Sequence, residues 1–439
     1  MAGGGVVKRV EGRHFLVLGL GKSGKAAKAA LERRGAVVDA MERADGAKVL
    51  EWAAGHPGAT VVASPGIAPS DPAIAAARRA GLEVRGELCL GCSLLPPSAR
   101  VVAVTGSKGK SSLVKLLADA LSASGRVAVP CGNYGRAVCD VADSAEPVQD
   151  AIVECSSFQL ETADEALAPD VAILLNLSSD HLDRHGSLGA YLDAKLAVFA
   201  NLKAGGVALV PAPSEDPSGI AAAFKARFPG RAFSTFGSGP DADFRAEVPS
   251  GSYFDSSVLR PAAAAAFAAL ERLGLGRERI LAALESFEPL PHRMQTVLRR
   301  GLVAWVDNSK ATSLAALVAS LEMAKRPILL LAGGRLKEPL SVPGGVLREK
   351  GVEKAYLFGE CGGEMARKWG TEIPVAQFEN LADATAAATF DAAAMDVGTV
   401  LLAPGTASFD QFSSYAERGN LFCSVAAERA GAAVPPHRP

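Results

Sequence analysis

A lysine and a serine, Lys110 and Ser111, stand where a glycine loop meets the start of an expected helix. The loop Gly106-Ser-Lys-Gly-Lys-Ser follows an apolar run typical of a buried strand, Val101–Thr105. In such a loop the backbone N–H groups point at phosphate oxygens, the lysine adds a positive charge, and the serine hydroxyl can hold Mg²⁺. Only two residues separate the glycines, fewer than in the common phosphate loop, which indicates a narrower family of ATP users. The residues that we expect to bind ATP are Gly106, Ser107, Lys108, Gly109, Lys110, Ser111 and Ser112.

Two further apolar runs end in side chains that could bind a metal. Glu154 lies near the end of the first run, Ala151–Cys155, where a carboxylate would meet Mg²⁺ held by the phosphate loop. The alternative is an ordinary strand end followed by Ser156 as the cap of the next helix, and spacing alone leaves the two interpretations even. The second run, Val171–Leu177, leads into Asp180-His-Leu-Asp-Arg-His, in which His181 is a candidate ligand.

Lys195 falls on the apolar face of the helix that follows. That face has the spacing of an amphipathic helix and comprises Leu188, Tyr191, Leu192, Leu196 and Phe199. A lysine in such a position either extends its amine to solvent or is desolvated, which lowers its pKa. A neutral amine can react with carbon dioxide to form a carbamate, an anion able to bind Mg²⁺. Position alone favours the solvent-directed lysine.

The beginning of the chain carries a second glycine loop. The apolar run Phe15–Leu18 leads into Gly19-Leu-Gly-Lys-Ser-Gly, an alanine-rich helix and another apolar run ending at Glu42, which fits a Rossmann-like unit. The same pattern occurs in NAD-dependent dehydrogenases, so that class of enzyme stays open at this point. Val61-Val-Ala-Ser-Pro-Gly then supplies a strand and a turn of the kind at which ligands bind in open α/β sheets.

At 439 residues the chain is too long for a single core. Breaks at Pro96-Pro-Ser and Pro289-Leu-Pro predict three α/β domains: a Rossmann-like domain over 1–97, a central P-loop ATPase-type domain with a mostly parallel sheet over 98–290, and a second Rossmann-like domain over 291–439. The formal net charge of −1 argues against nucleic acid as a partner. No apolar run reaches the ~20 residues of a membrane span, and no signal peptide is recognisable. We therefore expect a cytoplasmic protein, and the seven cysteines fit reduced, buried thiols better than a zinc site.

Seven motifs then follow one another along the chain. They are Gly106-Ser-Lys-Gly-Lys-Ser, Glu154-Cys-Ser-Ser-Phe-Gln-Leu, Asp180-His-Leu-Asp-Arg, Ala194-Lys195, His292-Arg293, Asn308-Ser-Lys-Ala-Thr, and Ser408-Phe-Asp-Gln-Phe with Glu417-Arg-Gly-Asn. In this order they resemble the motifs of the Mur ligases, across essentially the whole chain. The resemblance implies a ligase that activates the carboxylate of UDP-N-acetylmuramoyl-L-alanine with ATP and couples it to D-glutamate through an acyl phosphate, in peptidoglycan biosynthesis.

The resemblance also implies roles for individual residues in a monomeric enzyme. One Mg²⁺ ion would be held by Ser111 and Glu154, and a second by His181 and a carbamylated Lys195. The catalytic set would be Lys110, Glu154, His181 and Lys195. Positions near the nucleotide are matched by Arg293, Asn308 and Lys310. The implied substrate-binding residues are Lys22, Ser23, Glu42, Ser64 and Gly66 for the UDP group, Asn133 and Ser156 for the muramoyl group, and Thr312, Lys337, Ser408 and Tyr415 for D-glutamate.

The chain departs from the family pattern at several positions. Lys108 replaces an asparagine of the loop, Arg260 stands in a segment that usually carries two asparagines, and Asn308 takes the place of an aspartate. Arg335 stands where the family often has an acid, two residues before Lys337. These changes bear on nucleotide affinity and on the choice of amino acid. The alternatives left are a paralogue that accepts another amino acid, an NAD-dependent dehydrogenase and a non-catalytic nucleotide-binding protein. The first glycine unit argues against a folylpolyglutamate synthase, which lacks such a domain.

Overall fold

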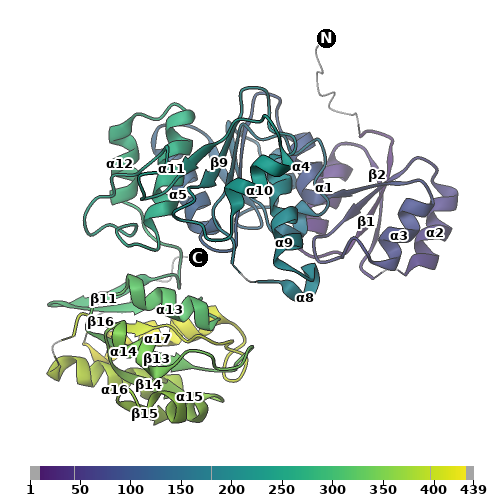
Figure 1. The fold of residues 1–439 in the computed structure, drawn as a ribbon. Helices are drawn as coiled ribbons and strands as arrows, with labels where there is room; N and C mark the ends of the chain where they lie inside the picture. Colours follow the sequence, from purple (N-terminus) through teal and green to yellow (C-terminus); the bar gives the residue numbers. More distant parts are fainter. Residues whose placement is uncertain (1–9, 44, 179, 396, 432–439) are drawn as a thin grey trace. The chain divides into compact units, whose positions relative to one another are not determined.

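The computed structural model describes residues 10–43, 45–178, 180–395 and 397–431 (Figure 1). The described chain divides into two compact units. The first contains the residues up to Asp255 together with Leu259–Phe287, and the second contains Ser256–Val258 and the residues from Glu288 on. Three mostly parallel sheets packed with helices make up the two units, so the predicted α/β fold class is confirmed.

The first sheet of the first unit is wholly parallel and has the order β2-β1-β3-β4. Its strands are β1 (His14–Leu18), β2 (Val37–Met41), β3 (Thr60–Ala63) and β4 (Glu83–Gly86), and the helices around them are α1 (Lys22–Arg33), α2 (Gly46–Gly55), α3 (Pro72–Arg79) and α4 (Glu87–Leu94). Helix α1 can start close against β1 because Gly24 has no side chain. A Cβ at that position would lie 1.8 Å from the carbonyl oxygen of Gly19.

The second sheet of the first unit is also parallel throughout, with the order β10-β9-β8-β5-β7-β6. Its strands are β5 (Arg100–Thr105), β6 (Ala128–Gly132), β7 (Asp150–Glu154), β8 (Val171–Leu174), β9 (Val207–Pro211) and β10 (Ser234–Phe236). Its helices are α5 (Lys110–Ala123), α6 (Val138–Ala142), α7 (Ser157–Leu160), α8 (Leu182–His185), α9 (Leu188–Leu196), α10 (Ile220–Arg227), α11 (Arg260–Arg272) and α12 (Arg277–Glu285), and a 3₁₀ turn (Ala197–Phe199) extends α9.

Strand β5 lies between β7 and β8, and this order positions the candidate site. The phosphate loop, Glu154 and the segment from Asp180 therefore all follow neighbouring parallel strands at one edge of the sheet. Strand β8 ends at Leu174, earlier than the expected run, because the backbone carbonyl of Asn176 accepts a hydrogen bond from Ser107 of the phosphate loop at 3.0 Å.

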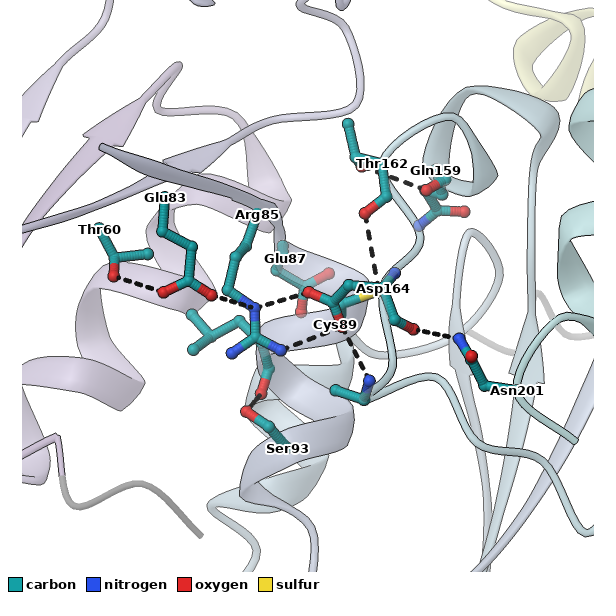
Figure 2. A network of polar contacts seen from close by, with 12 residues as sticks. Thr60, Glu83, Arg85, Glu87, Cys89, Ser93, Gln159, Thr162, Asp164 and Asn201 are labelled. Carbon is teal, nitrogen blue, oxygen red and sulfur yellow. Dashed lines mark hydrogen bonds and ion pairs between the residues drawn. The ribbon is translucent and has the colours of Figure 1, made fainter. Parts of the chain in front are cut away.

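Polar contacts join the two sheets of the first unit (Figure 2). Arg85 on β4 donates from Nε and Nη2 to the two carboxylate oxygens of Asp164, at 2.7 and 3.1 Å. The N–H of Asp164 donates to the sulfur of Cys89 at 3.4 Å. Nearby, the buried Glu87 accepts a hydrogen bond from the Cys139 N–H at 2.8 Å. These side chains come from segments far apart in the sequence, so no local pattern predicts this contact region between the two sheets.

The second unit contains one sheet of order β11-β12-β16-β13-β14-β15, in which only the β11–β12 pair is antiparallel. Its strands are β11 (Gln295–Arg300), β12 (Val303–Asp307), β13 (Ile328–Gly333), β14 (Val352–Phe358), β15 (Val375–Phe378) and β16 (Thr399–Leu402), and its helices are α13 (Leu314–Met323), α14 (Gly344–Glu349), α15 (Gly362–Trp369), α16 (Leu381–Ala394) and α17 (Tyr415–Arg429). Apolar residues alternate between two separate cores along β13, with Leu330 in one and Leu329 in the other.

Two further expectations concern the whole chain. Among the helices of the described residues, none is long and apolar enough to cross a membrane. All seven cysteines are unpaired; six are buried and Cys92 is half-buried.

Candidate active site

Both glycines of the phosphate loop adopt backbone angles that residues with side chains rarely take. The φ angle is 148° at Gly106 and 83° at Gly109. Helix α5 begins at Lys110, and Ser111 and Ser112 are buried in its first turn. The ammonium of Lys110 folds back over the loop and donates to the carbonyl of Gly106 at 2.8 Å and to that of the next residue at 3.1 Å. The expected ATP-binding residues therefore form a loop and the first turn of α5, with the lysine bonded back onto the loop.

The side chain of Asn176 holds this loop in place, a role that the sequence did not predict. Its Oδ1 accepts from the N–H groups of Ser107 and Lys108 at 3.2 and 2.9 Å, and its Nδ2 donates to the Lys108 carbonyl at 3.1 Å. The N–H of Ser178 donates to the Ser107 hydroxyl at 3.0 Å. The sequence signal that could have revealed this role is the position of Asn176, an amide side chain just after β8, the strand beside β5 and its phosphate loop.

Glu154 ends β7 with its side chain buried. Its Oε1 accepts from Nδ2 of Asn133 at 2.7 Å, whereas its buried Oε2 finds no hydrogen-bond partner among the described residues. A buried carboxylate oxygen left without a partner costs free energy that a bound cation would recover. Ser156 caps α7 in a capping box with Gln159, so its interpretation as a helix cap is confirmed and Glu154 remains a candidate ligand.

The ring of Tyr191 lies near both His181 and Lys195. The Lys195 ammonium is 4.2 Å from the centre of the ring, and the centroid of the His181 ring is 6.3 Å from it. The Tyr191 hydroxyl accepts a hydrogen bond from Ser107 of the phosphate loop at 3.4 Å. His181 itself is exposed and takes a left-handed backbone conformation with φ of 52°. The structure thus gathers the two candidate ligands and the loop around one aromatic side chain.

Lys195 is 1% exposed, so the expectation of a solvent-directed lysine is wrong. Its amine donates to the carbonyl of Gly106 at 2.9 Å, the same carbonyl that accepts from Lys110. Burial, followed by the positive charge of Lys110, lowers the pKa of Lys195 to about 7. The predicted apolar face is confirmed at Tyr191, Leu196 and Phe199, but Leu188 is exposed because α9 begins there at the surface.

The donor set around the loop suits Mg²⁺ better than a transition metal. Within the described ranges, no three histidine, cysteine, aspartate or glutamate side chains gather into a ready metal cage. Mg²⁺ is usually bound by one or two protein carboxylates and completes its shell with phosphate oxygens and water. Glu154, with one oxygen unused, and the hydroxyl of Ser111 at the start of α5 fit that demand.

The first sheet contributes the residues expected near the UDP group. The hydroxyl of Ser64, at the end of β3, donates to the carbonyl of Gly19 at 2.8 Å and so joins the two loops. The amine of Lys22, the first residue of α1, donates to the carbonyl of Gly135 in the loop that carries Asn133. Ser23 is half-buried in α1, and Glu42 and Gly66 are exposed at the ends of their strands.

In the second unit, the ammonium of Lys310 lies 3.9 Å from the centre of the Tyr415 ring. The preceding Ser309 donates its hydroxyl to the Tyr415 carbonyl at 2.7 Å, and the N–H of Thr312 donates to the Lys310 carbonyl at 2.9 Å. The N–H of Lys310 donates to the carbonyl of His292 at 3.1 Å. The residue after His292 is the half-buried Arg293. Residues predicted from separate motifs thus meet at one edge of the third sheet.

Asn308 turns its side chain into the unit. Its Oδ1 accepts from the N–H of Met294 at 3.2 Å, and its Nδ2 donates to the hydroxyl of Ser320 at 2.6 Å. The neighbouring acid, Asp307, is fully buried and bonded to Nδ1 of His292 at 2.6 Å. The expected contact of Asn308 with the nucleotide stays a prediction, and it would require these internal bonds to break.

A buried arginine underlies the loop that carries Ser408. Arg418 donates from Nε to the Ser309 hydroxyl at 3.0 Å and from Nη2 to the carbonyls of Ser309 and Thr406, at 2.9 and 3.2 Å. Burial lowers its pKa to about 10. Ser408 is buried and follows Thr406 by two residues. The backbone of Arg335 pairs with that of Ala407 in the same loop, and the exposed Lys337 follows Arg335 by two residues. The sequence had placed Arg418 in a motif but assigned it no role.

Comparisons with known proteins agree on one family. The Mur ligase middle domain family matches residues 104–261. The UDP-N-acetylmuramoylalanine--D-glutamate ligase of Rubrobacter xylanophilus is 37% identical over 450 residues, a match that covers 95% of this chain and 99% of the relative. The protein of the same name from Nitratidesulfovibrio vulgaris is 34% identical and matches over 93% of this chain and 94% of its own length.

Among solved structures, the fold is similar to that of the MurF ligase from Thermotoga maritima in complex with ADP. That match has a TM-score of 0.58 and 17% identity, and covers 97% of this chain and 96% of the other. At this identity the likeness concerns the fold alone. The relatives, which are ligases by name, leave the dehydrogenase interpretation of the first glycine loop without support.

Proposed function

The chain belongs to the Mur ligase family, and we propose that it joins D-glutamate to UDP-N-acetylmuramoyl-L-alanine at the expense of ATP, in peptidoglycan biosynthesis. The names of its relatives support this choice of substrates. The observation that carries the proposal is the buried amine of Lys195, which shares the Gly106 carbonyl with the lysine of the phosphate loop. If Lys195 only supported the fold, its amine would not need to lie so close to the positive charge of Lys110.

The reaction has two steps. ATP transfers its γ-phosphoryl group to a carboxylate oxygen of the muramoyl substrate, which gives an acyl phosphate and ADP. The amine of D-glutamate then attacks the acyl carbon, the bond from this carbon to the phosphate oxygen breaks, and inorganic phosphate and a proton leave. Catalysis of such a transfer consists mainly of positioning and of neutralising charge.

The residues of the phosphate loop and the metal ligands would position the phosphates and neutralise their charge. The N–H groups at the start of α5 would bind the phosphates, and Lys110 would exchange its two backbone carbonyls for phosphate oxygens. Two Mg²⁺ ions would neutralise the phosphates and the substrate carboxylate, one held by Ser111 and Glu154 and the other by His181 and the carbamate of Lys195. With a pKa of about 7, a substantial fraction of Lys195 is neutral near neutral pH, as carbamate formation requires.

The remaining residues would bind the substrates. In the first unit Lys22, Ser23, Glu42, Ser64 and Gly66 would contact the UDP group, and Asn133 and Ser156 the muramoyl group. In the second unit Arg293, Asn308 and Lys310 would contact the nucleotide, and Thr312, Lys337, Ser408 and Tyr415 the D-glutamate. We propose that the enzyme acts as a monomer in the cytoplasm, where ATP and UDP-linked sugars are made.

Phosphate release from ATP tests the function directly. We expect release with UDP-N-acetylmuramoyl-L-alanine and D-glutamate together, and little with L-glutamate or without an amino acid. Equal rates with L-glutamate, or no response to either isomer, would instead favour a paralogue that accepts another amino acid. Absence of ATP turnover in every case would favour a nucleotide-binding protein without catalysis.

Two substitutions test the D-glutamate pocket. Ser408→Ala and Lys337→Ala each remove a donor to a carboxylate, worth about 1.5–3 kcal/mol for a bond to a charged group. We expect the KM for D-glutamate to rise about tenfold or more while the KM for ATP changes little. Ser313 follows Thr312 in the chain, and its hydroxyl caps α13 by accepting from the N–H of Ala316. Ser313→Ala therefore provides a matched serine control, which should lower helix stability and leave the KM for D-glutamate unchanged.

A further inference from the structure

Arg184 is part of the segment that carries His181, but the proposed reaction gives it no role. Its guanidinium carbon lies 4.0 Å from the centre of the Phe158 ring. Its Nε donates to Oε2 of Glu161 at 3.2 Å, and Nη2 donates to the same oxygen. The N–H of Arg184 also bonds to the carbonyl of His181 at 3.1 Å. The side chain is 16% exposed, so most of it is packed against other parts of the unit.

A third contact of the same guanidinium reaches the first sheet. Nη1 of Arg184 donates to the carbonyl of Pro65 at 3.3 Å. Pro65 belongs to the Ser64-Pro-Gly turn at the end of β3, and Ser64 is bonded to the first glycine loop. One side chain therefore connects the turn proposed to bind the UDP group with the segment proposed to bind Mg²⁺.

Glu161 extends this connection towards Glu154. Its Oε1 lies 3.4 Å from Nδ1 of His185, and Nε2 of His185 is 3.0 Å from the hydroxyl of Ser157. Ser157 is the first residue of α7, which begins directly after the segment that ends β7 at Glu154. The contacts thus connect the Pro65 carbonyl with the segment that carries His181 and with the start of α7, three residues after Glu154.

We propose that Arg184 is a positioning residue that fixes the His181 segment relative to the bound muramoyl substrate. His181 is exposed, and one of the two rings that lie against it, Phe158, is the ring on which Arg184 stacks; the ring centroids of Phe158 and His181 are 4.9 Å apart. A planar guanidinium can stack on a ring while the N–H groups of its rigid fork donate to partners around its edge, a fixed geometry that the ammonium of a lysine does not reproduce. The inference rests on the proposed function, because it takes His181 as a metal ligand and the 64–66 turn as part of the substrate site.

Arg85 provides a matched control. It is 14% exposed, pairs with Asp164 through two nitrogens and joins the same two sheets, as Figure 2 shows. Its carboxylate partners, Asp164 and Glu83, lie outside the segment from Asp180 to His185. Loss of Arg85 therefore weakens the contacts between the two sheets without removing any contact of the candidate metal ligands.

The experiment compares Arg184→Lys with Arg85→Lys. Calorimetry would measure binding of UDP-N-acetylmuramoyl-L-alanine without ATP, and electron paramagnetic resonance would measure binding of Mn²⁺ with a non-hydrolysable ATP analogue. We expect Arg184→Lys to weaken Mn²⁺ binding about tenfold, as loss of support for a metal ligand typically does, and to raise the KM for the muramoyl substrate but not for ATP. Arg85→Lys should lower the melting temperature and leave Mn²⁺ binding unchanged.

The outcomes separate the two proposals. If the wild-type protein binds neither probe, the proposed function fails and this inference fails with it. If the wild type binds both probes and Arg184→Lys differs from Arg85→Lys in neither measurement, the role of Arg184 alone is overturned. A fall in melting temperature without any change in Mn²⁺ binding would likewise show that Arg184 only holds the sheets together.

Discussion

Of the described lysines and arginines, two are buried, Lys195 in the first unit and Arg418 in the second. Both bond to backbone carbonyls, but burial lowers the pKa of Lys195 to about 7 and that of Arg418 only to about 10. Near neutral pH the lysine can therefore lose its charge, whereas the guanidinium keeps it. The same physical cause, desolvation, prepares one side chain to react and leaves the other as a permanent cation.

The hydrogen bonds of the two residues differ in the same sense. Lys195 makes one bond, to a carbonyl that it shares with Lys110, and a neutral amine can still donate it. Arg418 makes three bonds that fix Ser309 and Thr406, at the base of the loop with Ser408. A buried lysine held by a single hydrogen bond is suited to react, whereas a buried arginine held by three hydrogen bonds is suited to fix the shape of a binding loop.

The sharpest test of this contrast is Lys195→Ala. We expect turnover to fall about a thousandfold, the upper range for loss of one electrostatic group in an active site. Acetate or another short-chain carboxylate should restore part of the phosphate release by taking the position of the carbamate. Lys195→Arg keeps a positive charge and should show no such rescue. An active Lys195→Arg would mean that the charge, as at Arg418, is what the site needs.

Removal of the neighbouring cation should have the next largest effect. Lys110→Ala deletes a charge from a loop whose shape is set by Gly106 and Gly109, so we expect turnover to fall at least about a hundredfold with an unchanged circular dichroism spectrum. Lys108→Ala, in the same loop but exposed, is the control and should lose less. Near-wild-type turnover of folded Lys110→Ala would contradict the assignment of the phosphate loop.

Arg418→Lys should have a smaller and more selective effect. A single ammonium cannot replace three donors in a fixed fork, and loss of one bond of about 1.5 kcal/mol raises the KM for D-glutamate about tenfold. The KM for ATP should not change. Arg348→Lys, at an exposed ion pair with Glu372 in the same unit, controls for the exchange of residue type. If only the melting temperature of Arg418→Lys falls, Arg418 supports the fold and not the pocket.

The smallest effect is a dependence of stability on pH. Because the pKa of Lys195 is about 7 in the folded protein and near 10.5 when unfolded, the unfolded chain binds more protons between these values. The free energy of unfolding, relative to Lys195→Met, should therefore rise with pH from about 7 towards 10. Denaturant unfolding in buffer free of carbon dioxide measures it, with the exposed Lys48→Met as the control. A flat difference would show that Lys195 is not desolvated.

The sequence predicted those parts of the molecule whose signal is local. The strand, loop and helix around Lys110 follow from apolar runs and glycine spacing, and the apolar face of α9 was predicted with Lys195 on it, although position alone favoured a solvent-directed amine. The size of its pKa shift could not be predicted, because burial and the charge of Lys110, which cause it, depend on a segment far away in the sequence. The order β7-β5-β8 brings these groups together, and no local pattern encodes that order.

Residues that act through distant partners were missed. Asn176 bonds to a loop 68 residues earlier, and Arg418 bonds to Ser309, which precedes it by 109 residues. The residues of strand β11 do not alternate regularly between apolar and polar; the strand is held by antiparallel pairing with β12. Such contacts come from topology, which a single sequence does not specify.

The seven unpaired cysteines have a practical consequence for measurements on this protein. Burial raises the pKa of every one of them, to about 12 at Cys89 and about 11 at Cys361, and the thiolate is the form that reacts with maleimides. The wild-type chain should therefore label slowly. A cysteine introduced at the exposed Lys48 and another at the exposed Phe390 would carry a pair of fluorophores over a low background, one on each unit, and energy transfer between them would follow the enzyme through its catalytic cycle.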